Sequence, residues 1–295
     1  AKKETGLKTA VEVANVKHVY SALKHNVDIL WLGARTTVNP FAVQEIADAL
    51  EGVDTTVLLK NPVNPDIDLW KGGIERILKA GVKNVGAIHR GFSKYGESNF
   101  RNPPQWQIPI ELKQRFPELT LICDPSHICG KRDTLLEISQ EAIDLNFDGL
   151  MIESHITPDE AWSDAKQQIT PFELKNLIEK IVIRESKFPK KGKDTELDNL
   201  RQKINILDSE LIEILSQRMK TTDLIGEYKK QNRIKILQSN RWEEIVEKSV
   251  IEGQSKGLTK DFIVKFLSDI HLESITRQNN IMNSNKWLNK ILNKN

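Results

Sequence analysis

The sequence has few of the residues that would mark a disulfide-rich or membrane protein. Its only cysteines are Cys123 and Cys129, one expected inside a strand and one just beyond it. This sparse use of cysteine argues against a disulfide scaffold and is typical of a reduced protein of the cytoplasm. No apolar run approaches the length of a membrane span, and no signal peptide opens the chain.

Charge and aromatic residues set two further limits. The formal net charge is only +2, which argues against a general role in binding polyanions. The six tryptophans are scattered and form no aromatic and basic platform for nucleic acid. With 39% hydrophobic and 28% charged residues, the 295-residue chain can bury a sizeable core in one or two domains.

Six short segments in the first 155 residues each run from β-branched residues directly into polar ones. Amphipathic segments of helical length separate them, which predicts repeated strand and helix units with parallel strands. The polar residues would then gather at the carboxyl ends of the strands, where a (β/α) barrel keeps its active site. We expect the strands at residues 7–13, 29–34, 56–60, 84–89, 120–124 and 149–153.

Three cationic side chains follow different strands of this predicted sheet. Arg35 and Arg90 carry planar guanidinium groups suited to phosphate, and Lys60 carries a compact charge suited to a carboxylate or phosphate. A single arginine after a strand is usually an ion-pair partner. Three cations at three strand ends favour a site for a phosphorylated anion.

A mixed set of nitrogen and oxygen ligands lies in the same part of the chain. His127, Glu153 and Asp164 would suit Mn, Fe, Co or Zn better than calcium. Taken singly, each is more typical of an ordinary surface or core residue. Together they indicate a divalent metal site.

The organisation of the sequence changes near residue 184. Residues 184–194 are polar, basic and interrupted by proline and glycine, so we interpret them as a linker between domains at residues 1–183 and 195–295. A nuclear-localisation or nucleic-acid segment is the less favoured interpretation of so short a basic cluster. From residue 195 the apolar spacing predicts helices at about 195–232, 239–254 and 259–290.

The first of these helices is too long for the two that follow to cover, which predicts a partner chain. The leucine spacing alone would favour a simple dimerising coiled coil. Against that interpretation, six polar residues are embedded along the helices. Four of them are cations, and cations that converge inside a bundle require a polyanionic ligand. These residues are Arg201, Arg218, Lys229, Arg241, Ser274 and Gln278.

The helical part resembles the all-helical, intertwined chorismate mutase family. The likeness covers residues 195–282 and rests on segments at 200–208, 217–219, 226–229, 241–244 and 271–278. It implies rearrangement of chorismate to prephenate in a homodimer or higher oligomer, without acid, base or metal. Arg201 would reach a substrate carboxylate from the partner chain, Arg218 would hold the other carboxylate, and Lys229 and Gln278 would contact the ether oxygen. Many relatives have acidic residues at the positions of Gln238 and Trp242, where they contact the substrate hydroxyl, so the resemblance does not extend to those contacts.

The first domain resembles the type Iβ synthases of 3-deoxy-D-arabino-heptulosonate 7-phosphate (DAHP). The likeness rests on seven motifs, at residues 33–41, 60–66, 89–93, 101–106, 123–130, 153–155 and 163–168. It implies condensation of phosphoenolpyruvate with erythrose 4-phosphate, with Arg35, Lys60 and Arg90 on phosphoenolpyruvate and a metal on His127, Glu153 and Asp164. Asp66, His89 and His155 are second-rank candidates for sugar contacts, proton transfer or metal support.

A complete barrel of this kind has eight strand and helix units, and six are expected here. The family's Pro-Cys-Ser-Ala-Glu segment, which supplies a cysteine ligand, and its Lys-Pro-Arg-Thr segment have no counterpart in the sequence. We therefore expect an α/β (β/α)8 TIM barrel that lacks its first two units, and a chain of this length that is defective as a synthase.

The resemblances together imply a bifunctional, cytoplasmic enzyme of the shikimate pathway. The main alternative is a helical domain that binds prephenate or chorismate and regulates the synthase instead of catalysing. A plain dimerising bundle is the structural alternative, and it predicts no chorismate binding.

Overall fold

The computed structural model describes residues 2–96, 98–184, 195–237 and 239–292. The chain divides into two compact units, one within residues 1–187 and the other within residues 188–295, and each is described by itself. All of the expected linker except Arg184 lies outside the described residues.

The first unit contains a single parallel sheet of six strands, as the sequence predicts. The strands lie in chain order, so every neighbouring pair is consecutive in sequence and β1 and β6 form the two edges. Several strands are shorter than expected, because their predicted ends belong to loops or begin the next helix. Their bounds are β1 Ala10–Glu12, β2 Ile29–Leu32, β3 Thr56–Lys60, β4 Asn84–His89, β5 Thr120–Cys123 and β6 Gly149–Leu150.

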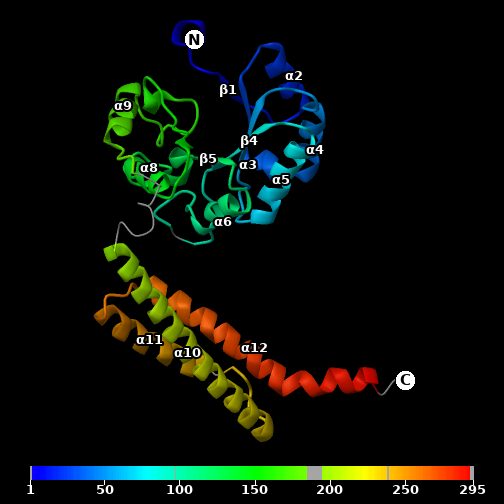
Figure 1. The fold of residues 1–295 in the computed structure, drawn as a ribbon, viewed down its shortest axis with the longest axis vertical. Helices are drawn as coiled ribbons and strands as arrows, with labels where there is room; N and C mark the ends of the chain where they lie inside the picture. The colour runs from blue at the N-terminus through cyan, green and yellow to red at the C-terminus, as the bar shows by residue number, and fades with distance from the viewer. Residues whose placement is uncertain (1, 97, 185–194, 238, 293–295) are drawn as a thin grey trace. The chain divides into compact units, whose positions relative to one another are not determined.

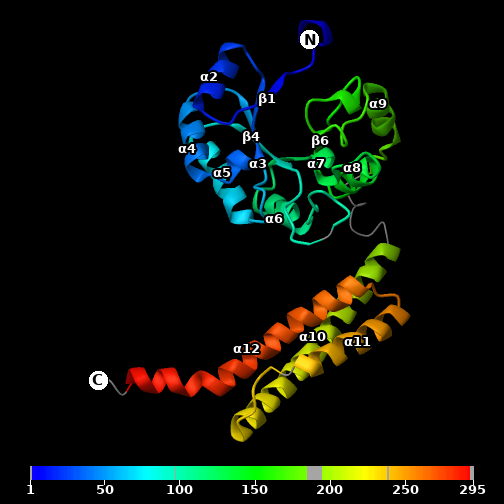
Figure 2. The same ribbon diagram turned by 180° about the vertical axis from the view of Figure 1, so that it is seen from behind.

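Helices follow the strands and form an arc around the outside of the sheet (Figures 1 and 2). Two of these helices begin at side-chain caps. Asn39 accepts hydrogen bonds from the backbone N–H groups of Phe41 and Ala42, and Thr170 forms a capping box with Glu173. The elements are α1 Lys2–Thr5, α2 Val16–Lys24, α3 Ala34–Thr37, α4 Pro40–Ala49, α5 Ile67–Lys79, α6 Gln107–Arg115, α7 Pro125–Cys129, α8 Leu135–Asp144, the 3-10 helix η1 Pro158–Glu160 and α9 Pro171–Lys180.

The core of this unit lies between the sheet and its helices. Leu30, Leu59 and Trp70 are completely buried there, and the Trp70 indole donates a hydrogen bond to the backbone carbonyl of Leu59 across 3.2 Å. Because such a close-packed interior resists deformation, it holds the ends of the strands in fixed positions.

The second unit consists of three helices: α10 Thr195–Asn232, α11 Ser239–Ser255 and α12 Lys260–Leu292. These bounds confirm the predicted helices. Helices α10 and α12 run side by side (Figures 1 and 2), and Gly226 permits their close approach, since a Cβ atom there would lie 3.3 Å from Cγ of Gln278. Among the described residues, no helix is both long and apolar enough to cross a membrane.

The apolar stripe of α10 is only partly covered within one copy of the unit. Leu200, Ile204, Leu207 and Leu211 are each more than 40% exposed. These side chains were expected to face a partner chain, and their exposure leaves them available for one.

Candidate active sites

A cavity of about 610 Å³ lies at the carboxyl ends of the strands in the first unit. It brings together all six cationic and metal-ligating residues that the sequence predicts for this part of the chain. They are Arg35, Lys60, Arg90, His127, Glu153 and Asp164.

The local folding of the chain explains this convergence. Lys60 is the last residue of β3, and Arg90 directly follows β4. Arg35 and His127 lie on the short helices α3 and α7, which begin within two residues of the ends of β2 and β5. Because the strands are parallel and in register, these ends meet at one edge of the sheet.

Lys60 is held by a buried carboxylate and an aromatic ring. Its Nζ atom lies 2.7 Å from Oδ2 of Asp124 and 4.5 Å from the centroid of the Trp31 ring. Burial alone would raise the pKa of Asp124, but the neighbouring His127 and Lys60 lower it below its ordinary value. Asp124 is therefore ionised at neutral pH and fixes the position of the lysine ammonium.

Arg90 is also fixed from several sides. Its guanidinium donates a 2.8 Å hydrogen bond to Oδ1 of Asn102, and its backbone N–H donates to Oδ1 of Asn61. Burial lowers the pKa of Arg90. Gly91 has a φ of +77°, and a Cβ atom at that position would lie 2.0 Å from the carbonyl oxygen of Asn102, so only glycine allows this packing.

His127, Glu153 and Asp164 form a cluster whose ligand atoms all lie within 4.8 Å of one another. Nδ1 of His127 lies 3.6 Å from Oε1 of Glu153. Gln167 donates a 2.9 Å hydrogen bond to the other oxygen of Glu153. An imidazole and two carboxylates, one of them oriented by a neighbouring amide, fit a divalent transition metal.

Arg101 lines the cavity, although the sequence analysis did not assign it. Its guanidinium donates to Oδ1 of Asp164 across 2.6 Å and to Oε1 of Gln167 across 2.9 Å. The hydrogen bond from Arg101 is the main reason that the pKa of Asp164 is lowered. Arg101 therefore extends to lower pH the range in which a predicted metal ligand is ionised.

Other residues at this site were also missed by the sequence analysis. Glu12, Trp31 and Asn102 line the cavity. Arg101 and Asn102 belong to the family motif at residues 101–106. They lie in the loop between β4 and α6 and not at the end of a strand, so the argument from strand ends could not place them. Glu12 is the last residue of β1.

The three second-rank candidates lie outside the residues that line this cavity. Asp66 is the cap of α5, where its carboxylate accepts from the backbone N–H of Leu69. His155 accepts through Nδ1 from the backbone N–H of Thr157. His89 is completely buried, and burial lowers its pKa to about 3, so its imidazole is neutral. Its ring packs near the rings of Trp70, Phe92, Trp106 and Phe147.

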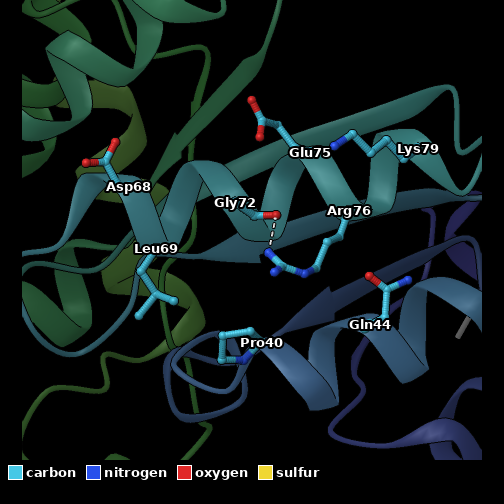
Figure 3. Close-up of a pocket in the computed structure, with 8 residues that line it drawn as sticks. All are labelled: Pro40, Gln44, Asp68, Leu69, Gly72, Glu75, Arg76 and Lys79. Atoms are coloured by element: carbon cyan, nitrogen blue, oxygen red, sulfur yellow. Dashed lines mark hydrogen bonds between the residues drawn. The ribbon is translucent and has the colours of Figure 1, made fainter.

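A second hollow of about 500 Å³ lies between α4 and α5 on the outer helical layer (Figure 3). It contains none of the predicted site residues. Its Arg76 donates a 2.9 Å hydrogen bond to the carbonyl oxygen of Gly72 in the preceding turn. Arg76 thus belongs to the same unit as the cavity at the strand ends but lies outside that cavity.

In the helical unit, part of the predicted polar set comes together between α10 and α12. The guanidinium of Arg218 donates a 2.8 Å hydrogen bond to Oγ of Ser274. Gln278 lies one turn further along α12 and is 8% exposed, and its Oε1 atom is buried without a hydrogen-bond partner. A buried acceptor without a donor is costly, which indicates that a ligand group or water completes this site.

The remaining cations of the set make other contacts. Lys229 donates a 2.6 Å hydrogen bond to the carbonyl oxygen of Ile236 in the loop after α10. Arg201 lies 3.6 Å from a carboxylate oxygen of Asp198, and Arg241 pairs with Glu244 across 3.1 Å. Arg201 is exposed near the N-terminal end of α10. The resemblance implies that this arginine reaches the substrate site of a partner chain.

Comparisons with known proteins match two separate parts of the chain. Residues 1–186 match the family model described as DAHP synthetase I family, and residues 200–279 match the one described as chorismate mutase type II. A phospho-2-dehydro-3-deoxyheptonate aldolase of Thermotoga maritima is 30% identical over 155 residues, which are 52% of this chain and 44% of the relative. The chain therefore spans less than half the length of that relative.

Solved structures show the same fold in the first unit. A truncated form of 3-deoxy-D-arabino-heptulosonate 7-phosphate synthase from Thermotoga maritima superposes with a TM-score of 0.54 and 24% identity over 60% of this chain and 65% of that one. A phospho-2-dehydro-3-deoxyheptonate aldolase structure from the same organism gives the same score and identity over 60% of this chain and 50% of that one. The chain belongs to the DAHP synthetase I family through residues 1–186, and this part is followed by a chorismate mutase type II region at residues 200–279.

Proposed function

We propose that this chain is bifunctional, with a phosphoenolpyruvate site in the first unit and a chorismate site in the helical unit. The observation that carries the first assignment is the convergence of Arg35, Lys60 and Arg90 on one cavity at the strand ends. Phosphoenolpyruvate presents a phosphate and a carboxylate, and paired guanidiniums with an ammonium suit those two groups.

The reaction proposed for the first unit joins phosphoenolpyruvate to erythrose 4-phosphate. Carbon 3 of phosphoenolpyruvate attacks the aldehyde carbon, water adds at carbon 2, and inorganic phosphate leaves. Arg35, Arg90 and Arg101 would hold the anionic groups, while Asp124 keeps Lys60 in place. A divalent metal of the Mn, Fe, Co or Zn group, bound by His127, Glu153 and Asp164, would polarise the aldehyde.

Calorimetric titration of phosphoenolpyruvate into the full chain tests the first assignment. We expect saturable binding that Arg90→Ala weakens and Arg76→Ala leaves unchanged, since Arg76 lies in the separate hollow of Figure 3. Equal weakening by both substitutions would mean that binding depends only on net charge. It would remove the support for a specific site.

For the helical unit we propose rearrangement of chorismate to prephenate. Support comes from Arg218, Ser274 and Gln278, which place a cation, a hydroxyl and an unpartnered amide oxygen close together. Chorismate carries two carboxylates, and its ether oxygen gains negative charge as the C–O bond breaks. Donors fixed beforehand around that oxygen would lower the barrier.

A regulatory role for the helical unit is the second candidate. The observation that favours it is the hydrogen bond from Lys229 to the carbonyl of Ile236, which occupies one of the lysine's donors. A unit that only binds prephenate or chorismate would inhibit the synthase of the complete protein without turning chorismate over. Chorismate disappearance catalysed by the full chain supports the first candidate, and binding without turnover supports the second.

The proposed oligomer is a homodimer or a larger assembly formed through the helical unit. The exposed stripe on α10 supports this, because four large apolar side chains in one row would lose contact with water in a dimer. We place the protein in the cytoplasm, since Cys123 and Cys129 are both free thiols.

A further inference from the structure

The strongest unassigned feature is an aromatic stack between α11 and α12. The imidazole of His271 lies parallel to the indole of Trp242, with the ring centroids 4.1 Å apart and the planes 10° from parallel. Both side chains are partly buried. The simplest interpretation is that the pair only packs the two helices together.

The position of His271 on α12 argues for more than packing. His271, Ser274 and Gln278 are spaced three and four residues apart, so they share one face of the helix. Ser274 accepts a hydrogen bond from Arg218, and Gln278 carries the unpartnered oxygen. The imidazole therefore continues the row of polar groups that lines the proposed substrate site.

The charges around His271 are mainly positive. Burial, and then the cations of Arg218 and Lys229 on α10, lower its pKa. On α11, the neighbours of Trp242 are Arg241 and Glu243, and Arg241 is paired with Glu244. On α12 itself, Glu273 is paired with Arg277. Partial burial and these cations thus disfavour the charged form of the imidazole.

We infer that His271 is a substrate-facing residue of the helical site and takes up a proton when a dicarboxylate binds beside Arg218 and Lys229. Two carboxylates would balance the cations that now disfavour a charged imidazole. The face of the Trp242 indole then stabilises the imidazolium through a cation–π contact. This inference rests on the proposed function, because it requires that the helical unit bind chorismate-like dianions.

The role assigned to Trp242 is that of a positioning residue. Its indole acts on the substrate only through the ring of His271, which it holds parallel at 4.1 Å. Affinity for a dianion should rise as the pH falls, by up to about tenfold per pH unit, which is the limit for uptake of one proton. A ligand with one carboxylate balances fewer cations and should give a smaller dependence on pH.

Calorimetry of the full chain with a bicyclic dicarboxylate analogue of the transition state tests this inference. Titrations near pH 6.5 in buffers of different ionisation enthalpy measure the number of protons taken up on binding. We expect uptake approaching one proton for the unmodified chain and for His25→Gln, whose ring is exposed in the other unit. We expect none for His271→Gln, and reduced uptake for Trp242→Leu but not for Trp242→Phe.

The outcomes separate the inference from the proposed function. If the analogue binds the unmodified chain without proton uptake, or if His271→Gln takes up as many protons, the inference is overturned while the proposed function stands. If the analogue does not bind at all, the proposed function fails and the inference fails with it. An absence of proton uptake by the unmodified chain overturns the inference even if a variant does not fold.

Discussion

The Nζ atom of Lys60 lies 2.7 Å from Oδ2 of Asp124, and the two side chains are only 5% and 1% exposed. The ammonium that the sequence offers to a ligand is thus already balanced by a buried carboxylate. The pair has a structural consequence that can be measured separately from ligand binding.

Replacing Asp124 with Asn should destabilise the first unit by about 3–5 kcal/mol, because the buried charge of Lys60 loses its partner. Urea unfolding followed by tryptophan fluorescence would measure this, since four of the six tryptophans precede residue 184. A double variant, Lys60→Met with Asp124→Leu, removes both charges and should recover much of the loss. A single variant as stable as the unmodified chain would contradict the account of the pair.

The same carboxylate predicts how stability depends on acid. The folded protein lowers the pKa of Asp124, despite its burial, through His127 and Lys60. Its contribution to stability is therefore fully present above the ordinary value of 3.8 and is lost as the pH falls through the lowered value. Unfolding free energies measured from pH 7 down to about pH 3 should fall less steeply below pH 4 in Asp124→Asn than in the unmodified chain. Parallel curves would show that Asp124 is not a source of the acid sensitivity.

Metal binding should depend on the cluster at the strand ends. Glu153→Gln removes one charged ligand from a set whose atoms lie within 4.8 Å of one another, so the affinity for Co²⁺ should fall by at least about tenfold. The visible absorption of bound Co²⁺ measures this directly. His25→Gln, in the same unit but outside the cluster, should leave the titration unchanged. An unaltered Co²⁺ affinity in Glu153→Gln would exclude Glu153 as a ligand.

Arg101 should affect the same site through Asp164. Arg101→Ala removes the main cause of the lowered pKa of Asp164, so protons should compete more strongly with the metal. We expect Co²⁺ affinity in this variant to decline more steeply than normal as the pH is lowered from about 5 towards the ordinary Asp164 pKa of 3.8. A uniform loss of affinity at every pH would mean that Arg101 positions the carboxylate without tuning its ionisation.

Catalysis in the helical unit should require Arg218. Arg218→Ala should cost about 3–4 kcal/mol of transition-state stabilisation in the conversion of chorismate, as loss of one fixed charged donor typically does. Circular dichroism should hardly change. Arg277→Ala is the matched control, because Arg277 pairs with Asp223 and Glu273 and lies outside the polar set. A normal kcat/KM in Arg218→Ala would refute its assignment.

The sequence could predict those features that local patterns determine. The six strands, the three long helices and the caps at Asn39 and Thr170 all follow from periodicity and capping chemistry. Arg35, Lys60 and Arg90 could be placed together because parallel strand ends meet at one edge. The cavity contains each of them.

Contacts between distant loops could not be predicted in this way. Arg101 reaches Asp164 over 63 residues, and the pairing of Lys60 with Asp124 joins the ends of β3 and β5, which are not neighbours in the sheet. The stack of Trp242 on His271 depends on how α11 packs against α12. No periodicity or motif spacing contains that information.

The most direct test of the account titrates one preparation of the full chain with phosphoenolpyruvate and then with the bicyclic dicarboxylate analogue, and repeats both titrations with Arg90→Ala and Arg218→Ala. We predict two saturable binding events, with Arg90→Ala weakening the first by at least about tenfold and Arg218→Ala weakening the second by a similar factor. Each variant should keep the other event. Failure of either ligand to bind the unmodified chain, or loss of both events through a single substitution, would contradict the assignment of one ligand site to each unit.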